Sequence, residues 1–254
     1  MKRLLFLPIL AALPLLPCPA QQGGSVMTTD SGEVRPLPRW LIEFSNLPRE
    51  TRARYIALFN LAKKAYREGR FVDAMAHMVD CEVIQRGNPG VWNLRACCLM
   101  EQKFFEEASA ELERVLKEQP DDHAALMNLA SMHMACGRYT KSLELLAQLR
   151  EALPCTTTPE VLNLLDFRAL LCHLMLGQDE EARALVAHLT PMADTPLYYY
   201  GRAAFALAEG KMSDYEYCLT AADNIFANNR ATEPYRRTLL LSGLQPGKAP
   251  SHPR

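Results

Sequence analysis

From Tyr55 onward, apolar residues recur at the three- and four-residue intervals that place side chains on one face of an α-helix. Two of these amphipathic stretches end at Pro120 and Pro154, and proline is a residue that stops a helix. The 254 residues include only 12 glycines and 17 prolines, which favours long helices over turn-rich β structure. The pattern therefore predicts an all-α protein.

The helical pattern repeats every 34 residues. An aromatic residue followed three positions later by a small one occurs three times at this period, as Phe71 and Ala74, Phe105 and Ala108, and Tyr139 and Ser142. Pro120 and Pro154 keep the same spacing. A fixed period of this length is typical of proteins in which each helical hairpin covers the apolar face of its neighbour.

On this register the sequence resembles the tetratricopeptide repeat family, whose unit of about 34 residues has small residues, an aromatic residue and a proline at fixed positions. The resemblance implies an all-α, right-handed superhelical solenoid of helical hairpins. Arg95 and Leu170 depart from the family pattern, because an apolar and a small residue, respectively, are usual there. The resemblance places five repeats at residues 55–88, 89–122, 123–156, 163–196 and 197–230.

The first twenty residues have the features of a secretory signal peptide. Lys2 and Arg3 precede an apolar run that ends at Leu16, and small residues precede a cleavage site after Ala20. The run is too short for a membrane-spanning helix, so we expect export to the periplasm or the exterior and no membrane span after cleavage. A second interpretation is a lipid anchor at Cys18. The expected divisions are a signal peptide at 1–20, a flexible linker at 21–38, a cap helix at 39–54, the repeats at 55–230, a C-terminal cap at 231–247 and a disordered tail at 248–254.

Charge and motif content point away from several classes of function. The chain has 28 Lys and Arg residues against 29 Asp and Glu residues, a balance that does not favour nucleic acid as a partner. Sequence signatures of zinc proteases, serine hydrolases and nucleotide-binding proteins do not occur. We therefore expect a protein that is not an enzyme, has no cofactor and binds no nucleic acid.

Soft metal ligands gather at residues 132–136 and 172–175, and methionine, histidine and cysteine together suit copper in an exported protein. Successive helical residues point about 100° apart, so Met132, His133 and Met134 cannot converge on one ion. We therefore expect no metal site and keep a copper carrier as an alternative function. Of eight cysteines, seven follow the leader, an odd number that leaves one thiol free or paired between chains.

The family resemblance also indicates where a partner binds. In the family, the first helix of each repeat lines the concave face, which here begins polar and basic and becomes apolar. We expect a protein-interaction module or scaffold of the cell envelope that binds a peptide or helix in this groove, with structural self-association as an alternative. The chain could instead cover the groove itself, and Tyr198 to Tyr200 could extend it. The expected contact residues are Phe59, Lys63, Tyr66, Asn93, Met127, Met134, Phe167, Leu171 and Met175.

Overall fold

The computed structural model describes residues 26–28, 34–190, 192, 195–226 and 231–247. The predicted signal peptide and tail lie outside the described residues, as does part of the predicted linker. The chain forms two compact parts, one ending at Asn128 and the other beginning at Leu129, which we call the N-terminal half and the C-terminal half.

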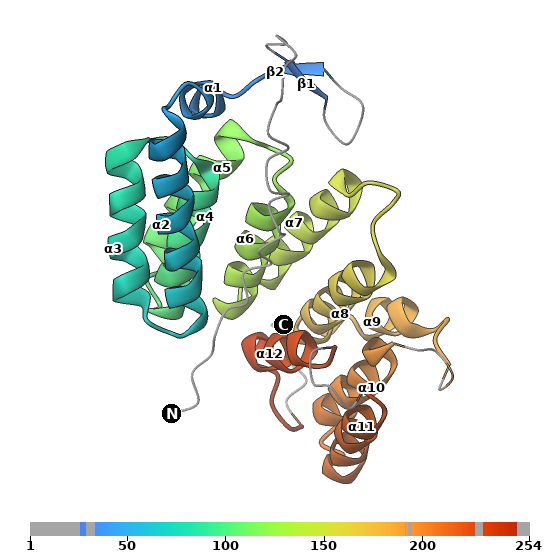
Figure 1. Ribbon diagram of the computed structural model, residues 1–254. Helices are drawn as coiled ribbons and strands as arrows, with labels where there is room; N and C mark the ends of the chain where they lie inside the picture. Colours follow the sequence, from blue (N-terminus) through green and yellow to red (C-terminus); the bar gives the residue numbers. More distant parts are fainter. Residues whose placement is uncertain (1–25, 29–33, 191, 193–194, 227–230, 248–254) are drawn as a thin grey trace. The chain divides into compact units, whose positions relative to one another are not determined.

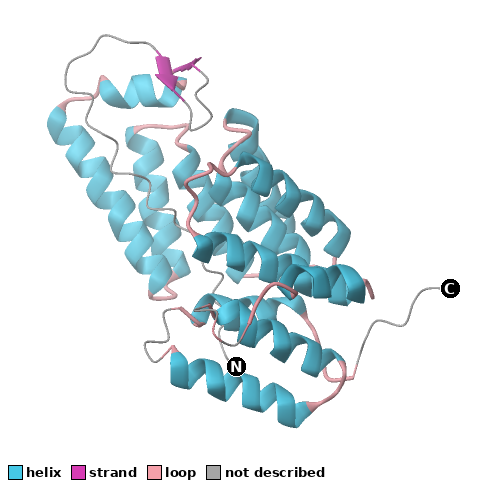
Figure 2. Cartoon of the chain, turned by 90° about the vertical axis from the view of Figure 1, so that its right-hand side faces the viewer, coloured by secondary structure: helices cyan, strands magenta, loops and turns pink. Residues whose placement is uncertain are grey.

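Figure 2 shows that helix dominates the described residues, so the predicted all-α class is confirmed. A two-stranded antiparallel ribbon, which the sequence pattern did not indicate, lies in the predicted linker, with Met27 of β1 (Val26–Thr28) opposite Arg35 of β2 (Val34–Pro36). The helices of the described residues (Figure 1) are α1 (Arg39–Ser45), α2 (Arg49–Arg67), α3 (Phe71–Ile84), α4 (Pro89–Glu101), α5 (Phe105–Glu118), α6 (His123–Ala135), α7 (Tyr139–Ala152), α8 (Pro159–Met175), α9 (Asp179–Val186), α10 (Pro196–Ala208), α11 (Met212–Ile225) and α12 (Glu233–Ser242).

The helices from α2 to α11 form five successive hairpins in the order of the predicted repeats. Each hairpin turns at a residue in the left-handed backbone region, with φ between 66° and 75°. Glycine provides this residue in four hairpins because it has no Cβ to clash with the backbone. The second hairpin uses Lys103 instead, at φ 66°, which makes it the strained member of the series.

Small residues allow the two helices of a hairpin to approach closely. In the N-terminal half, Ala62 of α2 and Ala74 of α3 are completely buried, and so are Ala96 of α4 and Ala108 of α5. α2 packs extensively on α3, and α4 on α5. The 34-residue period of the sequence therefore corresponds to repeated close contacts between helices.

Arg95 occupies a position that is usually apolar in the family, and the structure shows what replaces the apolar contact. Its guanidinium donates to Glu111 Oε1 of α5 at 3.0 Å and to Glu82 of α3. The side chain of Arg95 is only 15% exposed. This ion network joins three consecutive helices of the N-terminal half.

Leu170 of α8 is the second departure, a large residue where a small one is usual. It is completely buried and lies beside Gly201 of α10. A Cβ at Gly201 would make an ordinary contact of 3.6 Å with Leu170 Cδ1 but a tight one of 3.1 Å with Val186 Cγ1 of α9. The glycine therefore makes room for Val186, and Leu170 is accommodated without it.

Helix boundaries differ from the predicted divisions at two places. The predicted cap helix at 39–54 is a short helix, α1, followed by the first turns of α2, which begins at Arg49 rather than Tyr55. The predicted third and fourth repeats are separated by residues 157–162. Part of this insertion lengthens α8, which begins at Pro159. In the described part of the chain, every helix is too short or too polar to cross a membrane.

Candidate protein-interaction surface

The predicted contact residues of the first two repeats lie on α2 and α4. The Lys63 ammonium lies 4.9 Å from the centre of the buried Phe59 ring. Burial, followed by the charge of Arg67, lowers the pKa of Lys63 below its usual range. Tyr66 is also buried, and its hydroxyl donates to a carboxylate oxygen of Glu101 at 3.3 Å. Lys63 is thus a half-exposed cation whose ammonium group lies over the face of the Phe59 ring.

The predicted contact residue Asn93 of α4 is half-buried and polar. Its side-chain oxygen accepts a hydrogen bond from Asn128 Nδ2 at 2.9 Å. The same Asn128 amide lies 3.4 Å from Cys97 Sγ. Asn93 therefore links α4 to the middle of α6 while part of its surface stays exposed.

Most of the later predicted contact residues lie inside the protein. Met127 and Met134 of α6 are 2% and 1% exposed, and Phe167 and Leu171 of α8 are completely buried. Met175 is half-buried. Six of the nine predicted residues, including Phe59 and Tyr66, are therefore buried, and a partner reaches them only if something moves. Contact with a partner stays a prediction for all nine.

The C-terminal helix α12 covers the buried residues of α8. The Phe167 ring lies 5.2 Å from the Tyr235 ring and 6.0 Å from the Tyr200 ring of α10. Phe167, Leu171, Tyr235 and Leu239 belong to one buried cluster of the C-terminal half. Figure 1 shows α12 beside α8. The alternative that the chain covers its own groove is thus realised at the fourth repeat, by α12.

Polar contacts also hold α12 and the residues after it. The Tyr139 hydroxyl of α7 donates to the Ser242 carbonyl at 3.0 Å, and the Gly247 amide donates to the Leu207 carbonyl of α10 at 3.1 Å. Arg236 pairs with Asp223 of α11. Burial raises the pKa of Tyr235 to about 12, so its hydroxyl stays protonated at physiological pH.

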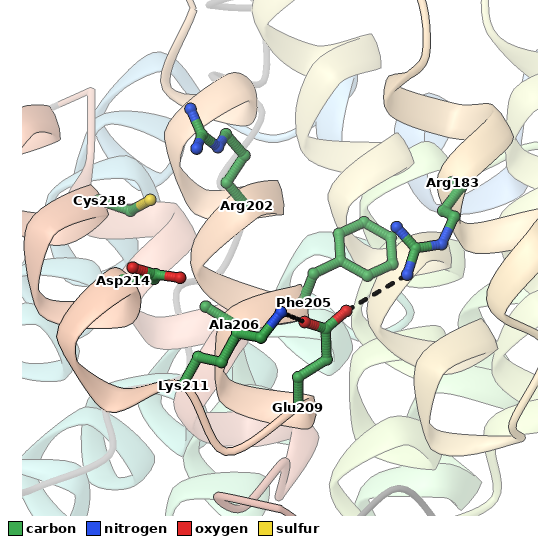
Figure 3. Close-up of a pocket in the computed structure, with 8 residues that line it drawn as sticks. All are labelled: Arg183, Arg202, Phe205, Ala206, Glu209, Lys211, Asp214 and Cys218. Carbon is green, nitrogen blue, oxygen red and sulfur yellow. Dashed lines mark hydrogen bonds and ion pairs between the residues drawn. The ribbon is translucent and has the colours of Figure 1, made fainter.

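A shallow surface pocket of about 220 Å³ lies among α9, α10 and α11 of the C-terminal half (Figure 3). Arg183 of α9 stacks on the Phe205 ring, 4.8 Å from its centre, and donates to Glu209 at 3.3 Å. Lys211 lies 2.7 Å from the same carboxylate. The pocket is lined by Arg183, Arg202, Phe205, Ala206, Glu209, Lys211, Asp214 and Cys218.

Arg202 is an exposed cation that lines the pocket. Figure 3 shows it on α10, across from Asp214 and Cys218 on α11. Among the described residues it makes no ion pair with a carboxylate, and it donates to the Tyr198 hydroxyl at 2.9 Å. That hydrogen bond raises the pKa of Arg202. Tyrosine and arginine on a surface are residue types that dominate protein interfaces.

The cysteines and candidate metal ligands are dispersed. All seven cysteines after the leader are free thiols, and five of them are buried. His133 is buried with its methionine neighbours, and His173 Nδ1 lies 2.8 Å from the Gln178 side-chain oxygen. In the described residues, no three His, Cys, Asp or Glu side chains lie close enough to hold a metal ion. The expectation that no metal, cofactor or catalytic residue is present stays a prediction.

Comparison with known proteins identifies the repeat. The family model described as tetratricopeptide repeat matches residues 65–130 and 99–165, two matches that begin 34 residues apart, which is the period of the sequence pattern. The chain contains tetratricopeptide repeats. Tetratricopeptide repeats form interaction scaffolds, because stacked hairpins offer a large preformed surface.

Two solved structures are similar to this tetratricopeptide repeat protein, and both are of MamA. A MamA mutant is 17% identical, with a TM-score of 0.47, and the match covers 68% of this chain and 98% of that one. The structure named MamA MSR-1 C2 is also 17% identical, with a TM-score of 0.45, over 69% and 98% of the two chains. Similarity at this level supports no functional assignment. No curated protein matches the chain.

The sequence reasoning missed two features of this surface. It treated residues 231–247 as a cap, and the return of α12 to α8 was not foreseen. The signal in the sequence was Tyr235 and Leu239, four residues apart on one face of a short helix. It also missed the pocket, because Arg183, Arg202 and Lys211 come from different helices.

Proposed function

We propose that the protein is a non-enzymatic scaffold of the cell envelope that binds a peptide or helix of another protein on the inner face of its repeats. The observation that supports this most is α12 itself. A helix of ten residues is seated on Phe167 and Leu171, which occupy inner-face positions of the fourth repeat. A face that accommodates a helix from its own chain has the shape and chemistry to accommodate one from a partner.

The first repeat adds a polar, basic part to this face. Lys63 is half-exposed, Arg67 is exposed, and Ile56 beside them is 45% exposed. Because the Phe59 ring supports the Lys63 ammonium from below, the cation is presented toward solvent in a restricted position. We propose that an acidic group of the partner binds here.

The test uses the chain without its leader as bait in an extract of the cell envelope, followed by titration of the captured protein in purified form. Replacing Lys63 with Glu should weaken binding at least tenfold, because it reverses the charge that faces the partner. Val83 on α3 is 80% exposed and lies outside the inner face, so Val83→Glu is the matched control. The proposal fails if Val83→Glu abolishes binding while Lys63→Glu leaves it intact.

Location in the envelope is tested separately. Residues 1–38 are fused to a reporter enzyme that is active only outside the cytoplasm, and we expect activity together with a shortened mature chain. A Cys18→Ser variant separates the two interpretations of the leader, because only a lipid anchor depends on that thiol. A reporter that stays inactive with an intact leader would contradict export.

A further inference from the structure

The last helix is not placed where a cap of the repeat stack belongs. A cap covers the apolar face of the final hairpin, because that face has no following repeat. α12 packs mainly on α8 and then on α10, rather than on α11, the helix that precedes it. On α11, Tyr217 and Ile225 remain 69% and 54% exposed. α12 therefore occupies the position of a ligand on the inner face.

The contact has the geometry of a helix in a groove. The Tyr235 ring lies 5.2 Å from the Phe167 ring of α8 and 5.4 Å from the Tyr200 ring of α10, so it is inserted between the two helices. Leu239, one helical turn later, is buried in the same cluster as Leu171. Two anchors at positions i and i+4 on one helix face are the usual contacts of a helix bound in an apolar groove.

The face that α12 buries is unusually polar. Thr232, Thr238 and Ser242 are essentially fully buried, whereas Leu240 is 66% exposed. Burying leucine stabilises a contact more than burying a hydroxyl group, whose lost hydration must be replaced by hydrogen bonds. A helix of ten residues is also marginal in isolation. The Thr238 and Ser242 hydroxyls donate to the Pro234 and Leu239 carbonyls of α12 itself, so they are satisfied without binding α8 or α10. They add less to docking than apolar side chains would.

We infer that the groove between α8 and α10 is a helix-binding site whose resident occupant is α12. The partner is an amphipathic helix with an aromatic residue and a leucine four residues apart, and it binds by taking the place of α12. This inference rests on the proposed function, for which it names the site and the class of partner. Because α12 competes in the same chain, a partner can bind only those molecules in which the groove is open. The measured affinity is therefore the affinity of the open groove multiplied by the fraction of molecules that are open.

The probe for this site is a fluorescein-labelled synthetic peptide of residues 231–247, and the readout is fluorescence anisotropy with the full chain. The Tyr235→Ala, Leu239→Ala double variant should bind the probe at least tenfold more tightly than the wild-type chain, because its own α12 no longer competes. Leu240→Ala is the matched control on the exposed face of the same helix and should bind as the wild type does. A probe with both anchors replaced by alanine should not bind.

The inference is overturned if the folded double variant binds the probe no more tightly than the wild type. Hydrogen exchange of the wild-type chain gives a second test that needs no substitution. Amides of α12 should exchange at least tenfold faster than those of α8, through local opening. Equal protection of the two helices would show that α12 leaves only when the whole core unfolds, and would overturn the inference.

Failure of this site and failure of the proposed function give different results. The probe experiment uses no foreign protein and concerns only α8, α10 and α12. The capture experiment depends on Lys63 of the N-terminal half. If a captured partner depends on Lys63 but the probe does not bind, the scaffold function is supported and the groove between α8 and α10 is not its binding site.

Discussion

Replacing Arg95 with alanine should destabilise the N-terminal half strongly. The substitution leaves Glu82, whose side chain is 26% exposed, without its cation, and leaves Glu111, 19% exposed, with only a 3.9 Å pair to the half-exposed Arg114. Removing one partner of a fully buried ion pair costs roughly 3–5 kcal/mol, and the partial exposure here reduces our expectation to about 2–4 kcal/mol. In urea, where the free energy of unfolding changes by roughly 1–3 kcal/mol per molar, the midpoint should fall by about 1–2 M.

Tryptophan fluorescence measures this half of the molecule selectively. The two tryptophans of the chain, Trp40 and Trp92, both precede Asn128. Trp92 is 4% exposed on α4, so its emission should change when the N-terminal half unfolds. Far-UV circular dichroism of the same samples then reports the helices of both halves. Arg95→Ala should therefore shift the fluorescence transition more than the dichroism transition.

Two further variants separate the ion network from a general loss of charge. Arg70 forms exposed pairs with Glu68 and Asp73, so Arg70→Ala should leave the fluorescence midpoint almost unchanged. Replacing Arg95 with methionine and both glutamates with glutamine should recover most of the lost stability, because the one charge that loses a partner, Arg114, is 51% exposed. The reasoning is refuted if Arg95→Ala lies within about 0.5 kcal/mol of the wild type, or if Arg70→Ala is equally destabilising.

Four other substitutions test the backbone conformations, packing and burial described above. Lys103→Gly should raise the free energy of unfolding by about 0.5–1 kcal/mol, because it relieves the strain of a left-handed backbone at a residue with a Cβ. Gly137→Ala should lower the free energy of unfolding by about 1 kcal/mol for the opposite reason. Shifts of the urea midpoint in the opposite directions would contradict this. Gly201→Ala should lower the free energy of unfolding by about 1–3 kcal/mol, because the new Cβ would lie 3.1 Å from Val186 Cγ1. An unchanged urea midpoint would show that Val186 shifts to make room. Cys155 is the exposed thiol among the described cysteines and should react fastest with a maleimide; a fast phase that survives Cys155→Ser would contradict the burial pattern.

The five hairpins could be predicted because their signal is local and periodic. Each pair of close-packed alanines, such as Ala62 and Ala74, lies within one repeat and recurs at a fixed distance along the chain. The ion network of Arg95 could not be predicted in this way. Its partners come from the helices before and after α4, and alignment of repeats compares equivalent positions rather than neighbours in space.

The burial of the predicted groove had a different cause. The family pattern predicts which side of α8 faces inward, and Phe167 and Leu171 of that side are buried under α12. It carries no information about α12, because α12 is not part of a repeat and its contact with α8 joins residues as far apart in the chain as Phe167 and Tyr235. Where a non-repeated helix docks is decided by shape and burial in the folded chain, and a periodicity cannot express either.

The Arg95 departure from the family pattern offers a comparison for α12. Arg95 has Glu82 and Glu111 placed to neutralise it, so this departure is matched by residues on the neighbouring helices. On α12, Tyr235 and Leu239 are buried together with the hydroxyl groups of Thr238 and Ser242, while Leu240 is exposed. Both hydroxyl groups donate to carbonyls of α12 itself, so these two hydrogen bonds do not fasten the helix to α8. Hydrogen exchange of α12 relative to α8 therefore decides whether this arrangement is a fixed cap or a replaceable occupant of the groove.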